Sequence, residues 1–468
     1  MRIIVLGAGR IGQYVAQGLL RDDHNVTLVD SRRESLDEAS QKMDVAIKVG
    51  RATDVALLGE LMHEHPELLL ALTDNDEANI VACSIARALG SFQSKVNSKA
   101  HSNFRTIARI QSPHYLSRDN FDLGRLFHID HIVIPDLLVA NQLATCALNY
   151  GLYSENFFHG AAHLRTIILP VHWKHSGKTL AEIRTLEKRL MVALIRRKTD
   201  SSASSPLPKD LIIFPHGQDA LFSGDEVTFI GNRNLDGEID KLLGNSSPEP
   251  RSALIMGGEL TAIHLAKELE SRNVKVRLGD SSKERCYELA RELPNCSILY
   301  TQGSDWDFLK AEKVGQVDVF VACTPIEEKN MQLSLFAKEQ GCSKVISVFS
   351  DQATRRLAEK LGIYHAISPR IAATDRILTL AKREKLTSML SLYDQRAEII
   401  EVKVSQNSPL VGIPLSLLGP RLPPEILIAA IYSKGKLFIA GGNHILSPKD
   451  EALVICHPLH RKFLEEYF

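Results

Sequence analysis

The sequence lacks a surplus of either charge, with 56 lysines and arginines against 56 aspartates and glutamates. A chain with this balance has no general electrostatic attraction for nucleic acid or for an anionic surface, so we expect no nucleic-acid partner. It also lacks any apolar run near the roughly 20 residues that a membrane-spanning helix needs. Residues 1–6 lead straight into a glycine loop and predict a strand, not a signal peptide. We therefore expect a cytoplasmic protein.

Cysteine is sparse and catalytic signatures are missing. The seven cysteines are scattered and form no C-x-x-C pair, which predicts reduced thiols. The sequence contains no G-x-S-x-G, H-E-x-x-H or Walker motif. The short histidine groups His63-Glu64-His65 and His172-Trp173-Lys174-His175 are predicted to be solvated surface side chains. The sequence thus predicts no catalytic residue and no metal site, and we expect that the protein is not an enzyme.

What the sequence does contain is a repeat with a period of about 250 residues. Residues 1–30 and 251–280 both read as strand, glycine turn, helix and strand, and both end in an aspartate. In each segment the aspartate follows the first loop glycine by 23 positions. Two later helices also correspond, and we expect them to end at Gly90 and Gly341 because glycine is the usual helix stop. Alternating strands and helices imply a parallel sheet in each half.

The first glycine turn, Gly7-Ala8-Gly9-Arg10-Ile11-Gly12, fits G-x-G-x-x-G and has the preceding strand, following helix and distant acid, Asp30, of a dinucleotide-binding loop. Gly7 permits the tight turn, Gly9 lets backbone N–H groups approach a pyrophosphate, and Gly12 allows close packing. The helix N-terminus adds partial positive charge. Asp30 can accept from ribose hydroxyls and would repel a 2′-phosphate, which favours NAD or an adenine nucleotide over NADP. The alternative is a Rossmann-like scaffold with an empty site.

Other residues are placed to reach the same ligand. Thr73 and Asp74 directly follow a strand, at the carboxyl end of the sheet where ligands bind in open α/β folds. They bond a ribose or the nicotinamide side, or else they only cap a helix. Arg10 either donates to a phosphate or is a solvated surface side chain. Arg51 and Arg109 are further candidates for contact with the ligand.

The second glycine turn, Gly257-Gly258-Glu259-Leu260-Thr261-Ala262, departs from the motif. Glu259 stands where the first loop has its middle glycine, and its carboxylate would repel a phosphate and take up its space. Gly257, Asp280 and Thr324 remain at matching positions. In place of a full second dinucleotide site, we expect an adenosine at a weak second site formed by these three residues, or an empty lobe.

The predicted fold class is α/β, with two tandem repeats of a Rossmann-like parallel-sheet domain, each followed by a small α+β domain. The expected boundaries are a first Rossmann-like domain over 1–128, a connecting helix over 129–150, a small domain over 151–243, a linker over 244–250, a second Rossmann-like domain over 251–376, a connecting helix over 377–391 and a small domain over 392–468.

These motifs resemble the TrkA family, the peripheral nucleotide-binding subunits of the Trk potassium uptake system. The resemblance is carried by the first glycine loop, Asp30, Thr73-Asp74-Asn75-Asp76-Glu77-Ala78-Asn79, Ala108-Arg109-Ile110-Gln111-Ser112-Pro113-His114-Tyr115 and Ile367-Ser368-Pro369. It covers essentially the whole chain, in the same order. Any one motif is modest, whereas the duplicated order is specific.

The resemblance implies two RCK (regulator of potassium conductance) domains, each an N-lobe followed by a C-lobe. It implies a homo-oligomeric ring, a tetramer, on the inner face of the cell membrane beneath a membrane potassium channel or transporter subunit of the TrkH or TrkG type. The implied regulatory ligands are NAD(H) and ATP or ADP. The positions that match the nucleotide contacts of the family are Gly7, Ala8, Gly9, Arg10, Ile11, Asp30, Arg51, Thr73, Asp74 and Arg109.

The chain also departs from the family pattern. Residues 91–105 are expected to be an insertion, and the strand over 345–349 has no arginine that matches Arg109. We expect a regulatory binding subunit that gates a membrane partner. Two rivals stay open: an NAD-dependent oxidoreductase, which requires a catalytic constellation that the sequence does not show, and an RCK-type regulator of another cation transporter.

Overall fold

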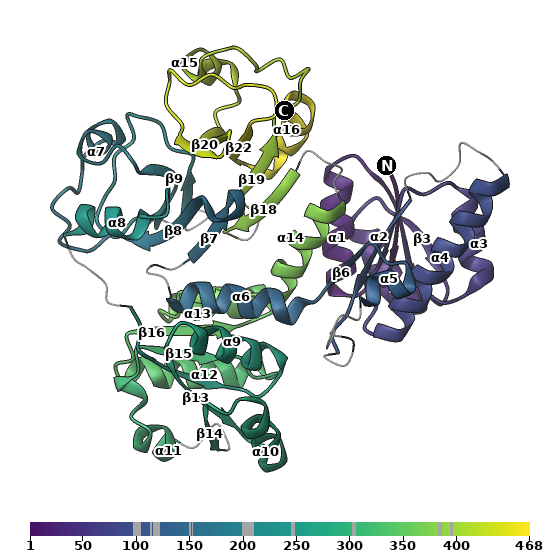
Figure 1. Cartoon of the computed structure of the whole chain (residues 1–468), viewed down its shortest axis with the longest axis horizontal. Helices are drawn as coiled ribbons and strands as arrows, with labels where there is room; N and C mark the ends of the chain where they lie inside the picture. The colour runs from purple at the N-terminus through teal and green to yellow at the C-terminus, as the bar shows by residue number, and fades with distance from the viewer. Residues whose placement is uncertain are drawn as a thin grey trace. The chain divides into compact units, whose positions relative to one another are not determined.

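The computed structural model divides by contacts into two compact units, residues 1–138 with 369–383, and residues 139–368 with 384–468. Figure 1 shows the elements of the whole chain. The structure describes residues 1–96, 104–112, 115, 122–148, 151, 153–198, 210–244, 249–301, 306–381, 386–393 and 396–468.

The first unit contains a six-stranded parallel sheet in the order β3-β2-β1-β4-β5-β6, which with its helices we call lobe 1. Strands β1 and β4 are almost entirely buried, as expected for a parallel sheet covered by helices on both faces. The strands are β1 (Arg2–Leu6), β2 (Asn25–Asp30), β3 (Ala46–Val49), β4 (Leu68–Ala71), β5 (Arg105–Arg109) and β6 (His131–Val133). The helices are α1 (Arg10–Arg21), α2 (Arg33–Lys42), α3 (Val55–His63), α4 (Asp76–Val96) and α5 (Leu123–Phe127).

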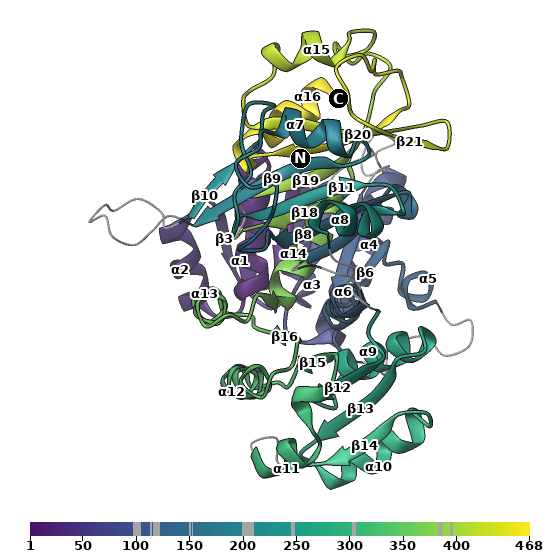
Figure 2. The ribbon, with the colours of Figure 1, turned by 90° about the vertical axis from the view of Figure 1, so that its left-hand side faces the viewer.

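The second unit contains a sheet of the same design, in the order β14-β13-β12-β15-β16-β17, which with its helices we call lobe 2. In Figure 2 this sheet lies between α9 and α12. The strands are β12 (Ser252–Met256), β13 (Lys275–Asp280), β14 (Ser297–Tyr300), β15 (Val319–Ala322), β16 (Lys344–Val348) and β17 (His365–Ile367). The helices are α9 (Leu260–Ser271), α10 (Lys283–Glu292), α11 (Trp306–Ala311), α12 (Glu327–Glu339) and α13 (Gln352–Lys360). The predicted pair of Rossmann-like sheets is confirmed.

The two predicted helix stops had different outcomes. Helix α12 ends at Glu339, and Gly341 follows with a φ of +94°, as a glycine stop requires. Helix α4 instead continues past Gly90 to Val96, so the predicted end at Gly90 is wrong. A Cβ on Gly90 would lie 3.3 Å from Met62 Cε and 3.5 Å from a ring carbon of Phe104. Gly90 lies within α4, and its lack of a side chain leaves space for Met62 and Phe104, which lie outside the helix. Residues 97–103 of the expected insertion over 91–105 lie outside the described residues.

Two connecting helices, α6 (Pro135–Leu148) and α14 (Pro369–Ala381), begin at a proline. Proline suits the first turn of a helix because it has no N–H, and N–H groups in that turn have no partner within the helix. The second was predicted over 377–391, which is wrong in part, because α14 ends at Ala381 and residues 386–392 form strand β18. By contacts, α14 belongs to the unit of lobe 1 and most of α6 to the unit of lobe 2. The connecting helix of each half therefore makes most of its contacts within the unit that contains the other lobe.

The small domains, module 1 (residues 153–244) and module 2 (residues 386–468), each hold a five-stranded antiparallel sheet, in the orders β10-β9-β11-β8-β7 and β18-β19-β22-β20-β21. They share one apolar core, in which Phe157, Leu164 and Ile230 of module 1 cluster with Ile399 and Leu453 of module 2. The strands are β7 (Tyr153–Phe157), β8 (Ala162–Ile168), β9 (Met191–Lys198), β10 (Asp210–Ile213), β11 (Glu226–Gly231), β18 (Leu386–Leu392), β19 (Ala397–Lys403), β20 (Ile426–Ser433), β21 (Lys436–Ile439) and β22 (Glu451–Cys456). The helices are α7 (Leu180–Leu186), α8 (Leu235–Leu243), α15 (Leu415–Leu418) and α16 (Arg461–Tyr467).

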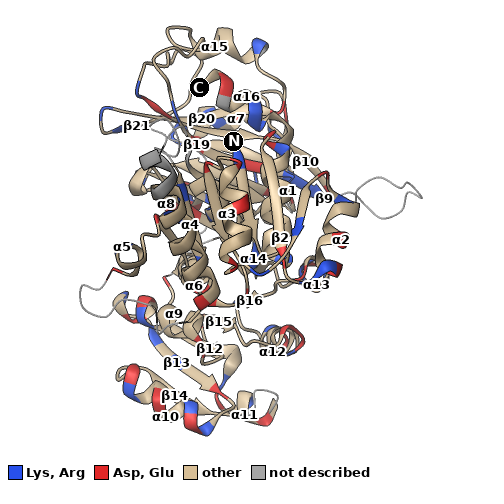
Figure 3. Ribbon diagram, turned by 90° about the vertical axis from the view of Figure 1, so that its right-hand side faces the viewer, with Lys and Arg blue, Asp and Glu red and all other residues tan. Residues whose placement is uncertain are grey.

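Three general properties of the chain are the state of its cysteines, the apolar length of its helices and the distribution of its charged residues. All seven cysteines are free, and six of them are buried. Within the described residues, no helix is long and apolar enough to cross a membrane. In Figure 3 basic and acidic residues are interspersed along α10.

Candidate functional site

The first glycine loop joins β1 to α1 at the point where the strand order of lobe 1 reverses, between β1 and β4. Gly7 has a φ of +104°, in the left-handed region, and its N–H donates to Val29 O at 2.7 Å. A Cβ on Gly7 would lie 2.9 Å from Thr73 N, and one on Gly12 would lie 1.9 Å from Gly7 O. The loop, α1 and the end of β4 therefore pack too closely for a side chain at Gly7 or Gly12.

Gly9 is different, because neither its backbone nor its neighbours demand a glycine. Its φ of −72° and ψ of −176° are open to any residue, and a Cβ there would meet nothing within 4 Å. Gly9 is the N-cap residue of α1, where the first helical N–H groups have no intrahelical partner. The opening beside Gly9 thus fits a phosphate bound to those N–H groups.

Asp30, at the end of β2, holds the glycine loop in place. Its carboxylate accepts from Ala8 N–H at 2.7 Å and from Arg32 N–H at 2.8 Å. A carboxylate offers about four lone-pair sites, so it can still accept from a ribose hydroxyl. Asp30 therefore both shapes the loop and offers an acceptor to a ligand.

Thr73 is tied to a buried asparagine six residues further along the chain. The N–H and the hydroxyl of Thr73 donate to Asn79 Oδ1, at 3.0 and 2.7 Å. The amide nitrogen of Asn79 donates to Thr73 O at 3.0 Å and to Arg109 O at 2.9 Å. Since its hydrogen is already used, the Thr73 hydroxyl can take part in ligand binding chiefly as an acceptor.

Arg109, at the end of β5, is mostly buried and incompletely bonded. Its Nη1 donates to Thr73 O at 3.3 Å. With the Gln111 amide turned so that its oxygen faces the guanidinium, Nη1 also donates to Gln111 at 2.9 Å. Its Nε is buried and has no hydrogen-bond partner within the described part of the chain. Burial lowers the pKa of Arg109, while Asp76, Asp136 and Asp74 oppose that shift.

The site residues predicted from the sequence fall into two groups: those that contact one another at the edge of the sheet, and those that lie on the surface or in the first turn of α1. Hydrogen bonds join Ala8 to Asp30 and Thr73 to Arg109 at the carboxyl edge of the sheet, with Gly7 packed against Thr73. Arg10, Arg51 and Asp74 are exposed, and Ile11 is half-buried in the first turn of α1.

Sequence reasoning missed Asn79, Asp76 and Gln111 as parts of this site. Asp76 is buried and accepts from the N–H groups of Gln111 and Ser112, which fixes the chain after β5. A signal for Asn79 was available, because a threonine followed six residues later by asparagine occurs in both halves. The contact of Gln111 with Arg109 depends on the folded chain and has no comparable signal.

The second glycine loop has the same backbone as the first but different surroundings. Gly257 has a φ of +123°, and a Cβ there would lie 2.7 Å from Cys323 O. Glu259 has a φ of −78° and a ψ of 176°, nearly those of Gly9, and its side chain is exposed. The glutamate therefore fits the loop without strain, and its side chain starts where lobe 1 has open space.

The ribose position of lobe 2 is partly occupied by its own side chains. A Cβ on Gly258 would lie 2.6 Å from Asp280 Oδ2, so the carboxylate packs directly against the loop backbone. Arg285 donates from Nε to Gly258 O at 2.9 Å and from Nη1 to Glu288 at 2.6 Å. In lobe 1 the corresponding carbonyl, Ala8 O, accepts from Gln13 Nε2 at 2.9 Å, so lobe 2 has a charged guanidinium where lobe 1 has a neutral amide.

The threonine–asparagine pair is repeated in lobe 2, whereas the arginine is not. Thr324 donates from its hydroxyl to Asn330 Oδ1 at 2.7 Å, and Asn330 donates to Val348 O at 3.1 Å. Val348 therefore occupies the position of Arg109, as the sequence predicted. Lobe 2 therefore has the same threonine–asparagine hydrogen bonds but no arginine beside them.

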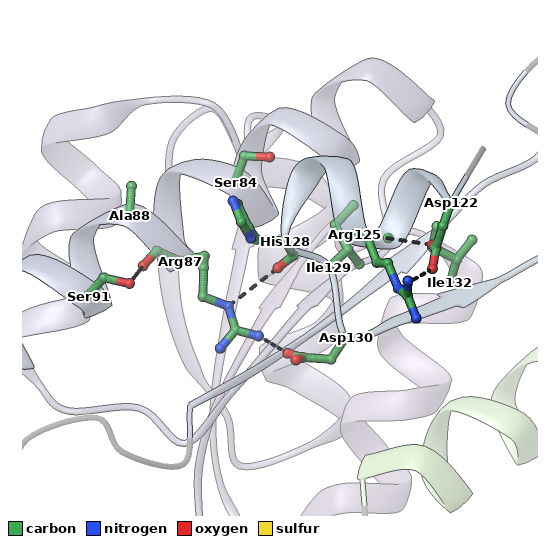
Figure 4. A pocket seen from close by; sticks show the side chains of 11 residues that line it. Ser84, Arg87, Ala88, Ser91, Asp122, Arg125, His128, Ile129, Asp130 and Ile132 are labelled. Atoms are coloured by element: carbon green, nitrogen blue, oxygen red, sulfur yellow. Dashed lines mark hydrogen bonds and ion pairs between the residues drawn. The ribbon is translucent and has the colours of Figure 1, made fainter. Parts of the chain in front are cut away.

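A cavity of about 920 Å³ lies elsewhere in lobe 1, between α4, α5 and the start of β6. In Figure 4 its charged side chains point toward one another: Arg87 donates to His128 O at 3.3 Å and pairs with Asp130, and Arg125 pairs with Asp122 at 3.2 Å. These charges are therefore already paired within the protein. The lining residues are Ser84, Arg87, Ala88, Ser91, Asp122, Gly124, Arg125, His128, Ile129, Asp130 and Ile132.

The sequence matches the TrkA-N domain model over residues 3–135 and 253–369 and the TrkA-C domain model over residues 399–468. It is 27% identical to "Trk system potassium uptake protein TrkA homolog 1" of Methanosarcina mazei over 470 aligned residues, covering 100% of both chains. It is also 27% identical to "Trk system potassium uptake protein TrkA" of Vibrio alginolyticus, covering 100% of this chain and 97% of that protein.

Solved structures share the fold at low sequence identity. The "GsuK RCK domain" aligns with a TM-score of 0.57 at 14% identity, covering 100% of this chain and 94% of that one. The "GsuK channel bound to NAD" aligns with a TM-score of 0.58 at 15% identity, covering 100% of this chain and 78% of that one. The duplicated lobes, the glycine loop and the matched domain models together establish that this chain belongs to the TrkA-N domain family.

Proposed function

We propose that this chain is a regulatory subunit of a Trk-type potassium transport system, which binds NAD(H) or ATP/ADP in lobe 1 and gates a membrane partner. The single observation that carries the ligand assignment is the opening at Gly9, at the N-terminus of α1. Full-length relatives named as Trk potassium uptake proteins support the physiological role. The GsuK channel bound to NAD, which shares the fold, supports the ligand class.

In this proposal, different residues of lobe 1 contact different parts of the nucleotide. The N-terminus of α1 binds the phosphates, and the carboxylate of Asp30 accepts from a ribose hydroxyl and repels a 2′-phosphate. Arg109, at the end of β5 next to Thr73, is the candidate to contact the part of the ligand beyond the phosphates. A nucleotide can change the conformation of the protein only as far as it binds two states unequally. The expected assembly is a homo-oligomeric ring, a tetramer, on the inner face of the cell membrane with a TrkH- or TrkG-like subunit.

Isothermal titration calorimetry with NADH, ATP and ADP tests the ligand site. Gly9→Glu places a carboxylate beside the phosphates in a partly dry site, and we expect binding to weaken by roughly 100-fold or more. Gly59→Glu is the matched control, because Gly59 lies in α3 and a Cβ there also meets nothing within 4 Å. Equal affinities of the wild type and a folded Gly9→Glu variant would remove the assignment.

The rival activity, NAD-dependent oxidoreduction, predicts turnover. The wild-type chain with NADH and a panel of carbonyl substrates should show no oxidation at 340 nm, because the proposed role is binding without a catalytic acid or base. Turnover that scales with protein concentration and is lost in Gly9→Glu would favour the enzyme. Co-purification with the membrane subunit of another cation transporter would instead favour an RCK-type regulator of that system.

A further inference from the structure

Helices α1 and α14 lie side by side and run in the same direction in the unit of lobe 1. Near the start of both helices, the guanidinium carbon of Arg370 lies 4.6 Å from the centroid of the Tyr14 ring. Further along both helices, a Cβ on Gly18 would lie 2.8 Å from Leu378 Cδ1. Because the two contacts follow the same order along both helices, α14 begins beside the first turns of α1, at the edge of the sheet that carries the first glycine loop.

The Tyr14 ring places Arg370 on the side of the first turn of α1. Tyr14 lies in the second turn, and helical side chains lean toward the N-terminus, so the ring covers the turn before it. That first turn begins at Arg10, directly after the open position at Gly9. The guanidinium of Arg370 therefore lies beside the turn whose N–H groups are proposed to bind phosphate.

Arg370 has no anionic partner in the part of the chain that the structure describes. It is half-buried, forms no ion pair with the described residues, and has a buried Nε without a hydrogen bond to any of them. The face of an aromatic ring attracts a cation, but it does not accept the directed N–H bonds that a carboxylate or phosphate accepts. Since buried charges are normally paired, an anion from outside the chain would supply the missing acceptor.

A base at position 370 is also unfavourable for α14 itself. Arg370 follows the proline that begins the helix, and the partial positive charge of a helix N-terminus repels a cation in the first turn. The other connecting helix begins with the matching pair Pro135-Asp136, whose acid suits that turn. The start of a connecting helix therefore does not require an arginine, whereas an anionic ligand beside α1 would favour one.

We propose that Arg370 binds phosphate in the lobe 1 site, so that the second half of the sequence recognises the terminal phosphate of a nucleoside triphosphate. This inference rests on the proposed function, because it requires a nucleotide at the first glycine loop. The N–H groups of that loop bind the phosphates nearest the nucleoside, and Arg370, on the adjacent helix, donates to the phosphate beyond them. Tyr14 is a positioning residue that holds the guanidinium. A triphosphate that contacts both helices also fastens α14 to α1.

Calorimetry with ATP, ADP and adenosine tests the contact on the full chain. Arg370→Met should weaken ATP binding by roughly 10-fold or more, weaken ADP binding less, and leave adenosine binding unchanged. Arg370→Lys should restore part of the ATP affinity, because it keeps the charge but not the paired N–H groups. Arg376→Met is the matched control, since Arg376 is exposed on the same helix and its loss changes the net charge equally.

Hydrogen exchange separates a contact with the ligand from a structural role. In the wild type, saturating ATP should raise the protection of residues 369–381 more than saturating adenosine does. That difference between the two ligands should disappear in Arg370→Met and persist in Arg376→Met. A purely structural role of Arg370 would lower the protection of α14 by the same factor with either ligand and leave the difference in place.

Two outcomes would overturn the inference. One is an unchanged ATP affinity in folded Arg370→Met, or in Arg370→Gln if the methionine variant does not fold. The other is an equal loss of affinity for ATP and adenosine. ATP binding that is lost in Gly9→Glu but kept in Arg370→Met would overturn this inference alone. A wild type that binds none of the three ligands would overturn the nucleotide site of the proposed function as well.

Discussion

Asn79 joins the ends of two strands in lobe 1 and is fully buried. Its side chain makes hydrogen bonds with the N–H, hydroxyl and carbonyl of Thr73 and with the carbonyl of Arg109. Truncating it leaves several buried polar groups without partners, each costing about 1–3 kcal/mol. The asparagine is therefore a structural requirement of the corner that presents Thr73 and Arg109 to a ligand.

We expect Asn79→Ala to lower the free energy of unfolding of its cooperative unit by roughly 2–4 kcal/mol. Asn330→Ala should have a similar effect in lobe 2, because Asn330 makes the corresponding bonds with Thr324 and Val348. Asn141→Ala, at an exposed position of α6, should change stability by about 0.5 kcal/mol or less. Urea denaturation measures all three. A loss below about 1 kcal/mol for Asn79→Ala would show that water replaces the lost bonds.

The roles of single glycines could be predicted only in part from the sequence. Gly7 and Gly12 are where the motif requires them, and their backbone angles or close contacts explain why. Gly9 was expected for its missing side chain, and its ordinary backbone angles agree with that reason. Asp30 was expected to bind a ribose, but its bond to Ala8 N–H could not be foreseen, since it depends on how the loop turns back toward β2. Asp30→Ala would therefore disturb the loop itself, which makes Gly9→Glu the cleaner test.

At the scale of elements, the approach of α1 to α14 depends on Gly18. A Cβ there would meet the terminal methyl groups of Leu378 at 2.8 and 3.1 Å, which can move slightly. A full leucine side chain adds three more carbons and has no such room. Overpacking of this kind costs about 1–3 kcal/mol.

We therefore expect Gly18→Leu to lower the free energy of unfolding by about 1–3 kcal/mol. Gly59→Ala should raise it by up to about 1 kcal/mol, because Gly59 lies within α3 with open space around it and alanine is the better helix former. Thermal unfolding followed by circular dichroism compares the two. Shifts of the same sign would mean that helix propensity, not the contact with Leu378, governs position 18.

The order of elements was largely predictable from the sequence, whereas the partners of two helices were not. Periodic apolar residues and glycine turns define both parallel sheets, because these signals are local. The sequence predicted the existence of α6 and α14 but not that each belongs by contacts to the other half. That exchange depends on close approaches such as Gly18 to Leu378, which involve residues far apart in the chain.

At the scale of the whole molecule, the two halves should differ in ligand binding. Lobe 1 has open space at Gly9, whereas lobe 2 has Glu259 with the same backbone angles, and Val348 replaces Arg109. We expect close to one dinucleotide per chain, counted by native mass spectrometry or calorimetry. Glu259→Gly should add at most a weak second site, because Asp280 and Arg285 still crowd the loop. Two equivalent tight sites in the wild type would contradict this view of lobe 2.

The exchange of connecting helices has a consequence for how the halves can diverge. If two separate chains of one repeat each made the same exchange, the pair would be symmetric, and every substitution would appear on both sides. Joining the repeats in one chain removes that constraint, so matching positions can carry different residues. Gly9 with Glu259 and Arg109 with Val348 are such positions. A tandem chain can therefore change a residue in one half while the matching residue of the other half is kept.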